Sequence, residues 1–165
     1  MLLFVLIISN VYSVQQGPTS PEEAQAYMAA HPVETHPQMN PWNGGPGKAQ
    51  CTWFEQELST AAAAGKQVIM SCHHPVGWGC ARPTHMAWNW RELHATMVRA
   101  GCVRLCLHGH DHEGGYAEVD GIHYLTLPGL VEGMRVTTGR WNESTSTYHS
   151  TAWWQCVQRD YRVWG

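Results

Sequence analysis

Cys102–Tyr116, with the sequence CVRLCLHGHDHEGGY, joins a mostly apolar run of strand type to three histidines at every second position. Imidazoles two apart at a strand end are expected on one side of the backbone, and the glycines that follow allow a sharp turn. Ring nitrogens arranged in this way suit a divalent transition metal. We therefore predict a metal site at the end of this strand, which indicates hydrolytic chemistry.

A second histidine pair follows another predicted strand, residues 67–72. There His73-His74-Pro75 opens a loop, rich in Gly and Pro, that continues to Met86. In open α/β sheets, binding sites form in the loops beyond the carboxyl ends of the strands. We therefore expect the two histidine loops to lie at the same edge of one sheet.

The rest of the chain alternates predicted strands and helices, which places it in the α/β class. Helices are expected from Ser20 to about His31, from Lys48 to Gly65, and from Asn89 to Gly101. A hairpin is expected at residues 116–119 and 122–127, turning at Asp120-Gly121. The apolar stripes of the second and third helices should face the core: Cys51, Phe54, Leu58 and Ala62, and then Trp90, Leu93, Met97 and Val98. We expect one domain in residues 1–136 and a divergent tail in 137–165.

Composition limits the function classes. The chain has 165 residues and a formal net charge of −3, so no basic footprint for nucleic acid is present. The apolar run Leu2–Ile8 is far shorter than the ~20 residues that span a bilayer. No Lys or Arg precedes this run, and no small-x-small site follows it, so we interpret it as a strand buried on both faces rather than as a signal peptide. We expect no membrane partner and a cytoplasmic location.

The six cysteines agree with a reducing compartment. None forms a Cys-x-x-Cys pair, and Cys72, Cys102 and Cys106 fall in apolar runs that are typical of buried strands. We expect them to be thiols rather than disulfides.

The two histidine motifs resemble those of a known family. Gly109-His110-Asp111-His112, preceded by His73-x-Pro75, is similar to the last two metal motifs of the calcineurin-like metallophosphoesterases. Within that family, the resemblance is to the manganese-dependent ADP-ribose/CDP-alcohol diphosphatases, and it covers residues 40–135. Further segments match in the same order: Asn43-Gly44-Gly45, Ala87-Trp88-Asn89-Trp90-Arg91, Glu113-Gly114-Gly115-Tyr116, and Ile122-His123-Tyr124 to Glu132.

The resemblance implies a fold, a set of metal ligands and an activity. The fold would be the carboxyl-terminal half of a four-layer sandwich of mixed sheets flanked by helices. His73 and His110 would bind one divalent ion and His112 the other, with His74 as a neighbour rather than a ligand. The ions would be manganese, with iron or zinc as alternatives, and the substrate a pyrophosphate-linked nucleoside such as ADP-ribose or CDP-choline. Paired ions of this kind offset developing charge and lower the pKa of bound water from ~15.7 to roughly 7.

The chain also departs from the family's pattern. The front motifs, Asp-x-His, Gly-Asp and Gly-Asn-His, would supply a bridging carboxylate, an Asn ligand and a His beside the leaving group, and they do not occur here. The only aspartates are Asp111, Asp120 and Asp160. We therefore expect the chain to be a carboxyl-terminal half that holds no catalytic residue of its own and shows no diphosphatase activity in isolation. An amino-terminal half would be its natural partner.

Substrate contacts are expected at five positions that resemble the family: Asn43, Gly44, Gly45, Trp88 and Tyr116. Trp78 and Trp90 could likewise stack a nucleoside base, although burial in the core explains any of these rings equally well. Arg91 could meet a phosphate or could simply be an exposed helix charge.

Two other classes of function stay open. One is a non-catalytic remnant that binds metal or nucleotide through His73, His110 and His112. The other is a structural zinc module built from His108, His110, His112 and the cysteines, although its ligand spacings match no standard zinc pattern.

Overall fold

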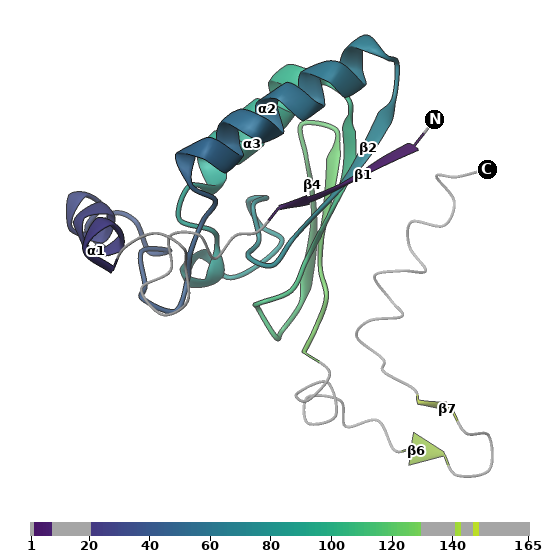
Figure 1. The fold of residues 1–165 in the computed structure, drawn as a ribbon. Coiled ribbons are helices and arrows are strands. Elements are labelled where there is room, and N and C mark those ends of the chain that lie inside the picture. The colour runs from purple at the N-terminus through teal and green to yellow at the C-terminus, as the bar shows by residue number, and fades with distance from the viewer. Residues whose placement is uncertain (1, 8–20, 130–140, 143–146, 149–165) are drawn as a thin grey trace.

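The computed structural model describes residues 2–7, 21–129, 141–142 and 147–148 (Figure 1). They form a five-stranded mixed sheet, three α-helices and a short 3₁₀ turn, with a separate two-stranded hairpin. The helices are α1 (Pro21–Ala30), α2 (Lys48–Ala63) and α3 (Trp90–Ala100), and the 3₁₀ turn is η1 (Pro83–His85). The strands are β1 (Leu2–Ile7), β2 (Gln67–Cys72), β3 (Val103–His108), β4 (Gly115–Val119), β5 (Ile122–Thr126), β6 (Trp141–Asn142) and β7 (Thr147–Tyr148).

The main sheet has the strand order β1-β2-β3-β5-β4. β1, β2, β3 and β5 run parallel, and β4 pairs antiparallel with β5. Parallel neighbours need a crossover, and α3 supplies it between β2 and β3. The hairpin turn of β4 and β5 falls at Asp120-Gly121, where both residues have positive φ (52° and 73°), as predicted. The α/β prediction is confirmed.

The two long helices begin and end close to where the sequence predicts. In α3, Asn89 precedes the first turn, and Gly101 ends the helix in the left-handed conformation with φ 66°, its N–H donating to the Met97 carbonyl. The Asn89 side chain does not cap the helix: its Nδ2 donates to the Pro46 carbonyl instead. Gly65, just beyond α2, is also left-handed, with φ 62°.

The main core lies between the sheet and helices α2 and α3, which cover one face of it (Figure 1). Phe54 and Leu58 of α2 are fully buried there, against Val68 and Met70 of β2. Burying a side chain of this size contributes roughly 1.5–3 kcal/mol. A smaller cluster of Ala24, Met39 and Trp88 forms under α1. The sheet is therefore packed against α2 and α3 on this face (Figure 1).

Two details of the predicted core are wrong. Val98 is 41% exposed, because the buried stripe of α3 is narrower than predicted and consists of Trp90, Leu93 and Met97. Ala61 rather than Ala62 is the buried residue near the end of α2. β1 is a strand, as predicted, and it lies at one edge of the sheet, where Leu2 is half exposed.

Several expectations lie outside the described residues. They concern the tail 137–165 except for β6 and β7, the end of the resemblance near Glu132, the start of the first helix at Ser20, and Cys156. Within the described ranges, no helix has both the length and the apolar character needed to cross a bilayer.

Candidate metal centre

The two histidine loops meet because β2 and β3 are parallel neighbours. Ser71 pairs with Leu107, and the ladder continues past the strand ends, where the Gly109 N–H donates to the His73 carbonyl at 3.0 Å. This register sets His74 beside His110, with ring centroids 4.1 Å apart. The expectation that both loops share one edge of the sheet is therefore correct.

Three imidazoles converge at this edge. One ring nitrogen from each of His73, His74 and His110 can be chosen so that all three lie within 4.8 Å of one another. Nε2 of His73 lies 3.2 Å from Nδ1 of His110. A divalent ion with nitrogen ligands at about 2.0–2.1 Å needs ligand atoms spaced by a few ångströms, which this cluster provides.

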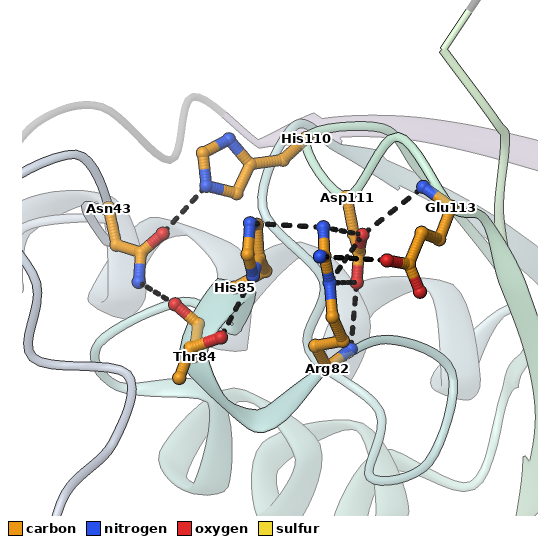
Figure 2. Close-up of polar contacts among 7 residues, drawn as sticks. All are labelled: Asn43, Arg82, Thr84, His85, His110, Asp111 and Glu113. Carbon is orange, nitrogen blue, oxygen red and sulfur yellow. Dashed lines mark hydrogen bonds and ion pairs between the residues drawn. The ribbon is translucent and has the colours of Figure 1, made fainter. Parts of the chain in front are cut away.

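Asn43 fixes which nitrogen of His110 faces the cluster. Its Nδ2 donates to the carbonyls of Gln38 and Thr84, at 2.8 and 2.7 Å, so its Oδ1 must be the acceptor toward His110. The His110 Nε2–H accordingly donates to that oxygen at 2.6 Å (Figure 2). The lone pair then sits on Nδ1, which points toward His73. Metal-binding histidines usually donate their second ring N–H in this way.

The electrostatics keep the cluster uncharged at neutral pH. Burial, followed by the adjacent His110 and His73, lowers the pKa of His74 to about 3. Burial, followed by His73 and His85, lowers the pKa of His110 to about 4. The pKa of His73 is also lowered, first by burial and then by His112. Neutral imidazoles have the lone pairs that metal binding requires.

The three alternating histidines do not point to one side, which corrects the expectation. His110 has φ 64°, a left-handed conformation that interrupts the strand alternation. His108 is 3% exposed and lies inside the core, where its Nδ1–H donates to the Cys72 carbonyl at 3.3 Å and its ring stacks on Tyr124. His112 is exposed, and its backbone carbonyl accepts from the Gly129 N–H. Only His110 joins the cluster.

Asp111, between His110 and His112, is a buried carboxylate with a partner of its own. It is 1% exposed and receives hydrogen bonds from the backbone N–H and the guanidinium of Arg82, the shortest at 2.6 Å (Figure 2). Burial alone would raise the pKa of Asp111, yet the bonds from Arg82 outweigh it and hold that pKa below its ordinary range. Asp111 is therefore engaged away from the imidazole cluster.

The expected substrate contacts differ in their accessibility. Asn43 is fully buried and serves His110, and the Gly44 carbonyl accepts from the Trp88 N–H. A side chain at Gly45 would collide with that of Asn89, so close packing explains this glycine. Trp88 is 2% exposed and stacks on Tyr27, which agrees with the alternative that this ring is buried in the core. Tyr116 is 36% exposed, and its hydroxyl lies 2.8 Å from His123 Nδ1.

The other aromatic and cationic positions are also placed. Trp78 is 52% exposed and stacks on Trp90, which is largely buried. The Arg91 guanidinium lies over the Trp90 ring, 4.5 Å from its centroid. Arg91 is thus engaged in a cation–π contact on its own helix.

Two residues of the site could not be found from motifs alone. His74 lies next to His110 because of the register between β2 and β3, and aligning the two strand ends would have paired them. Arg82 has no motif signal; the only hint was that a buried Asp111 would need a cation. The zinc-module alternative finds no support, since in the part of the chain that the structure describes the only group of three or more potential ligands that converges is His73, His74 and His110.

Comparisons with known proteins find similar sequences over part of the chain. No protein-family model matches the chain. A manganese-dependent ADP-ribose/CDP-alcohol diphosphatase of Oryza sativa subsp. japonica is 37% identical over 92 residues, which are 55% of this chain and 29% of the relative. The protein of the same name in Arabidopsis thaliana is 34% identical over 92 residues, 55% of this chain and 30% of the relative. The one in Homo sapiens is 26% identical over 133 residues, 74% of this chain and 39% of the relative.

A solved structure shows the same fold. The crystal structure of a dimetal phosphatase from Danio rerio superposes with a TM-score of 0.71 at 23% identity, covering 79% of this chain and 47% of that chain. The chain thus spans about a third of the length of these curated relatives and about half of the solved one. The comparisons confirm that the chain resembles the manganese-dependent ADP-ribose/CDP-alcohol diphosphatases over about half its length and shares the metallophosphoesterase fold.

Proposed function

We propose that this chain provides the histidine half of a metal centre for hydrolysis of a pyrophosphate-linked nucleoside such as ADP-ribose or CDP-choline. The observation that supports this most is the His73, His74 and His110 cluster, in which Asn43 fixes the tautomer of His110. The names of the similar proteins supply the substrate class, which the chain's own contacts do not specify.

The residues fit one divalent ion. His110 would bind through Nδ1, with Asn43 holding the opposite ring nitrogen, and His73 and His74 would complete a set of neutral nitrogen donors. Manganese is the ion named for the relatives, although imidazole ligands also suit zinc and iron. When bound, such ions polarise phosphoryl oxygens and activate water. His112, exposed on the same loop, is our proposed ligand for a second ion.

A second ion would need a carboxylate that the described residues do not place in the cluster. Asp111 is engaged with Arg82, and Asp120 pairs with His94 at the β4–β5 turn. Three neutral imidazoles do not offset the charge of two divalent ions. We therefore propose that the 165 residues bind metal but do not turn over substrate alone, and that turnover needs carboxylate ligands from an amino-terminal half. A metal-binding protein without catalysis is the corresponding alternative.

The test is metal titration of the purified chain together with a hydrolysis assay. We expect about one Co²⁺ or Mn²⁺ per chain, binding that is lost in His110→Ala, and no AMP from ADP-ribose or CMP from CDP-choline. Failure of the unmodified chain to bind metal at millimolar concentration would refute the site. Turnover that disappears in His110→Ala would instead refute the proposed inactivity.

Two further variants separate the possible ligand sets. If the first ion binds to the imidazole cluster, His74→Ala should lower the affinity for that ion as strongly as His73→Ala does. His112→Ala should then leave the first ion in place. The opposite ranking would favour the ligand set that the family resemblance implies.

We also propose a reducing compartment, such as the cytoplasm, for this chain. No disulfide joins the five cysteines of the described residues, and four of these thiols are buried. The mass of the chain after alkylation under non-reducing, denaturing conditions tests this, since each thiol adds one label. A mass that shows fewer labels than cysteines would contradict the proposal.

A further inference from the structure

Arg82 and Asp111 form a contact that neither the metal ligands nor the substrate contacts explain. Asp111 lies on the loop after β3, directly after His110, and Arg82 lies on the loop after β2. The Arg82 backbone N–H donates to Asp111 Oδ2 at 2.8 Å, and its guanidinium donates to Oδ1 through Nη2 at 2.6 Å and through Nε at 3.1 Å. A carboxylate that is 1% exposed is stable only with such donors, so this pair is a fixed feature of the loop.

The pair fixes the backbone on one side of His110. Asp111 also accepts the Glu113 N–H at Oδ1, and its own carbonyl accepts the Gly114 N–H. On the other side, the Gly109 N–H donates to the His73 carbonyl. His110 between these anchors has φ 64°, which a residue with a side chain rarely adopts. The conformation therefore depends on contacts that hold both of its neighbours.

The same segment also reaches the His110 ring. The Thr84 carbonyl, two residues after Arg82, accepts a hydrogen bond from Asn43, whose Oδ1 accepts the hydrogen bond from His110 Nε2–H. Arg82 Nη2 also lies 3.3 Å from His85 Nε2, and the His85 ring centroid is 5.5 Å from that of His110 (Figure 2). Residues 82–85 thus hold Asp111, the residue that follows His110, through Arg82. They also reach the His110 ring indirectly, through Asn43.

We propose that Arg82 is a positioning residue, which acts through Asp111 to hold His110 in the left-handed conformation that directs its Nδ1 into the imidazole cluster. This inference rests on the proposed metal function. Arg82 is not one of the three clustered imidazoles: its guanidinium contacts Asp111, Glu113 at 2.9 Å and His85 at 3.3 Å. Its contribution is to the geometry of a ligand, and such supporting partners typically change metal affinity by ~10–100-fold.

The experiment measures Co²⁺ binding to the full chain by its visible absorption, with Arg82→Ala, Asp111→Asn and the double variant. We expect the dissociation constant to rise ~10–100-fold in each single variant, with altered band positions. The double variant should lose no more than the singles, because both changes break one contact. Arg99→Ala is the matched control, since Arg99 pairs with Glu55 at 3.2 Å on the helices, and it should bind as the unchanged chain does. Equal affinity in Arg82→Ala and the unchanged chain would overturn the proposal.

A metal-free measurement separates this inference from the proposed function. The ¹⁵N spectrum of the imidazoles should show His110 as a single Nε2–H tautomer in the unchanged chain and as an averaged mixture in Arg82→Ala. Absence of Co²⁺ binding together with that change would refute the metal function and leave the positioning role supported. An unchanged tautomer in Arg82→Ala would overturn the positioning role. Arg82→Lys keeps the charge but not the planar fork, so it carries the same test if Arg82→Ala does not fold.

Discussion

His108 should make the metal-free protein sensitive to acid. Its ring is 3% exposed, its Nε2 is buried without a hydrogen-bond partner, and burial lowers its pKa to about 4 from an ordinary 6.5. Burial is the cause that lowers this pKa, and the hydrogen bond to the Cys72 carbonyl acts against it and raises the pKa. No other titrating group contributes to the shift. The side chain therefore isolates the effect of burial on a single ionisation.

The sign follows from which state binds the proton first. Below pH 6.5 the unfolded chain protonates His108 while the folded chain does not, so the free energy of unfolding falls as the pH is lowered toward 4. Above pH 6.5 the contribution is complete. With these two pKa values, the loss between about pH 7.5 and 4.5 amounts to roughly 2–3 kcal/mol. That is a large part of the 5–15 kcal/mol typical of a domain.

The perturbation is His108→Phe, which keeps the ring stacked on Tyr124 and removes the titration. Near pH 7.5 the variant should lie within about 1 kcal/mol of the unchanged chain, because it loses one long hydrogen bond and one orphaned nitrogen. The assay is urea unfolding followed by circular dichroism at both pH values, with a chelator present. All other groups are shared, so the difference between the two pH profiles reports His108 alone. Profiles that run parallel from pH 7.5 to 4.5 would refute the reasoning.

Three further outcomes are expected. Leu58→Ala should lower the free energy of unfolding by about 2–5 kcal/mol, because it opens a cavity under α2, and a loss below 1 kcal/mol in urea titration would contradict the packing. Gly101→Ala should cost about 1 kcal/mol, since φ 66° is strained for any side chain, whereas a more stable variant would argue against the left-handed end of α3. Burial raises the pKa of the Cys106 thiol well above its ordinary value. In the folded chain, alkylation mapped by peptide mass should therefore modify the half-buried Cys51 before Cys106. The reverse order would contradict the burial of Cys106.

The elements that the sequence predicts well are those coded by neighbouring residues. An apolar run predicts the strand at residues 67–72, and apolar periodicity with a glycine at its end predicts the helix that stops at Gly101. Both elements lie where expected. The turn at Asp120-Gly121 is coded by two adjacent residues and is also correct. Local signals of this kind suffice for element type and for the edge of the sheet where the site lies.

The features that the sequence did not predict depend on contacts between distant segments. Whether His74 or His112 stands nearest His110 is set by the register of β2 against β3 and by the left-handed turn at His110, and no local pattern encodes either. His108 is buried because it still belongs to β3 and lies on the same face as the buried Cys106, whereas His110 leaves that alternation at the left-handed turn. Val98 was misassigned because the width of a helix's buried face depends on how the helix lies on the sheet.

The ladder contact from Gly109 to His73 has a consequence for how the site forms. His73 and His110 are 37 positions apart, and α3 must complete its crossover before the strands that carry them can pair. A local metal motif can close around its ion while the remainder of the chain is unfolded, whereas this cluster comes into being only with the finished sheet. An ion added during refolding should therefore leave the folding rate unchanged and slow only the unfolding rate. Since only the folded chain binds the ion, the amount of bound metal then reports the fraction of the chain that is folded.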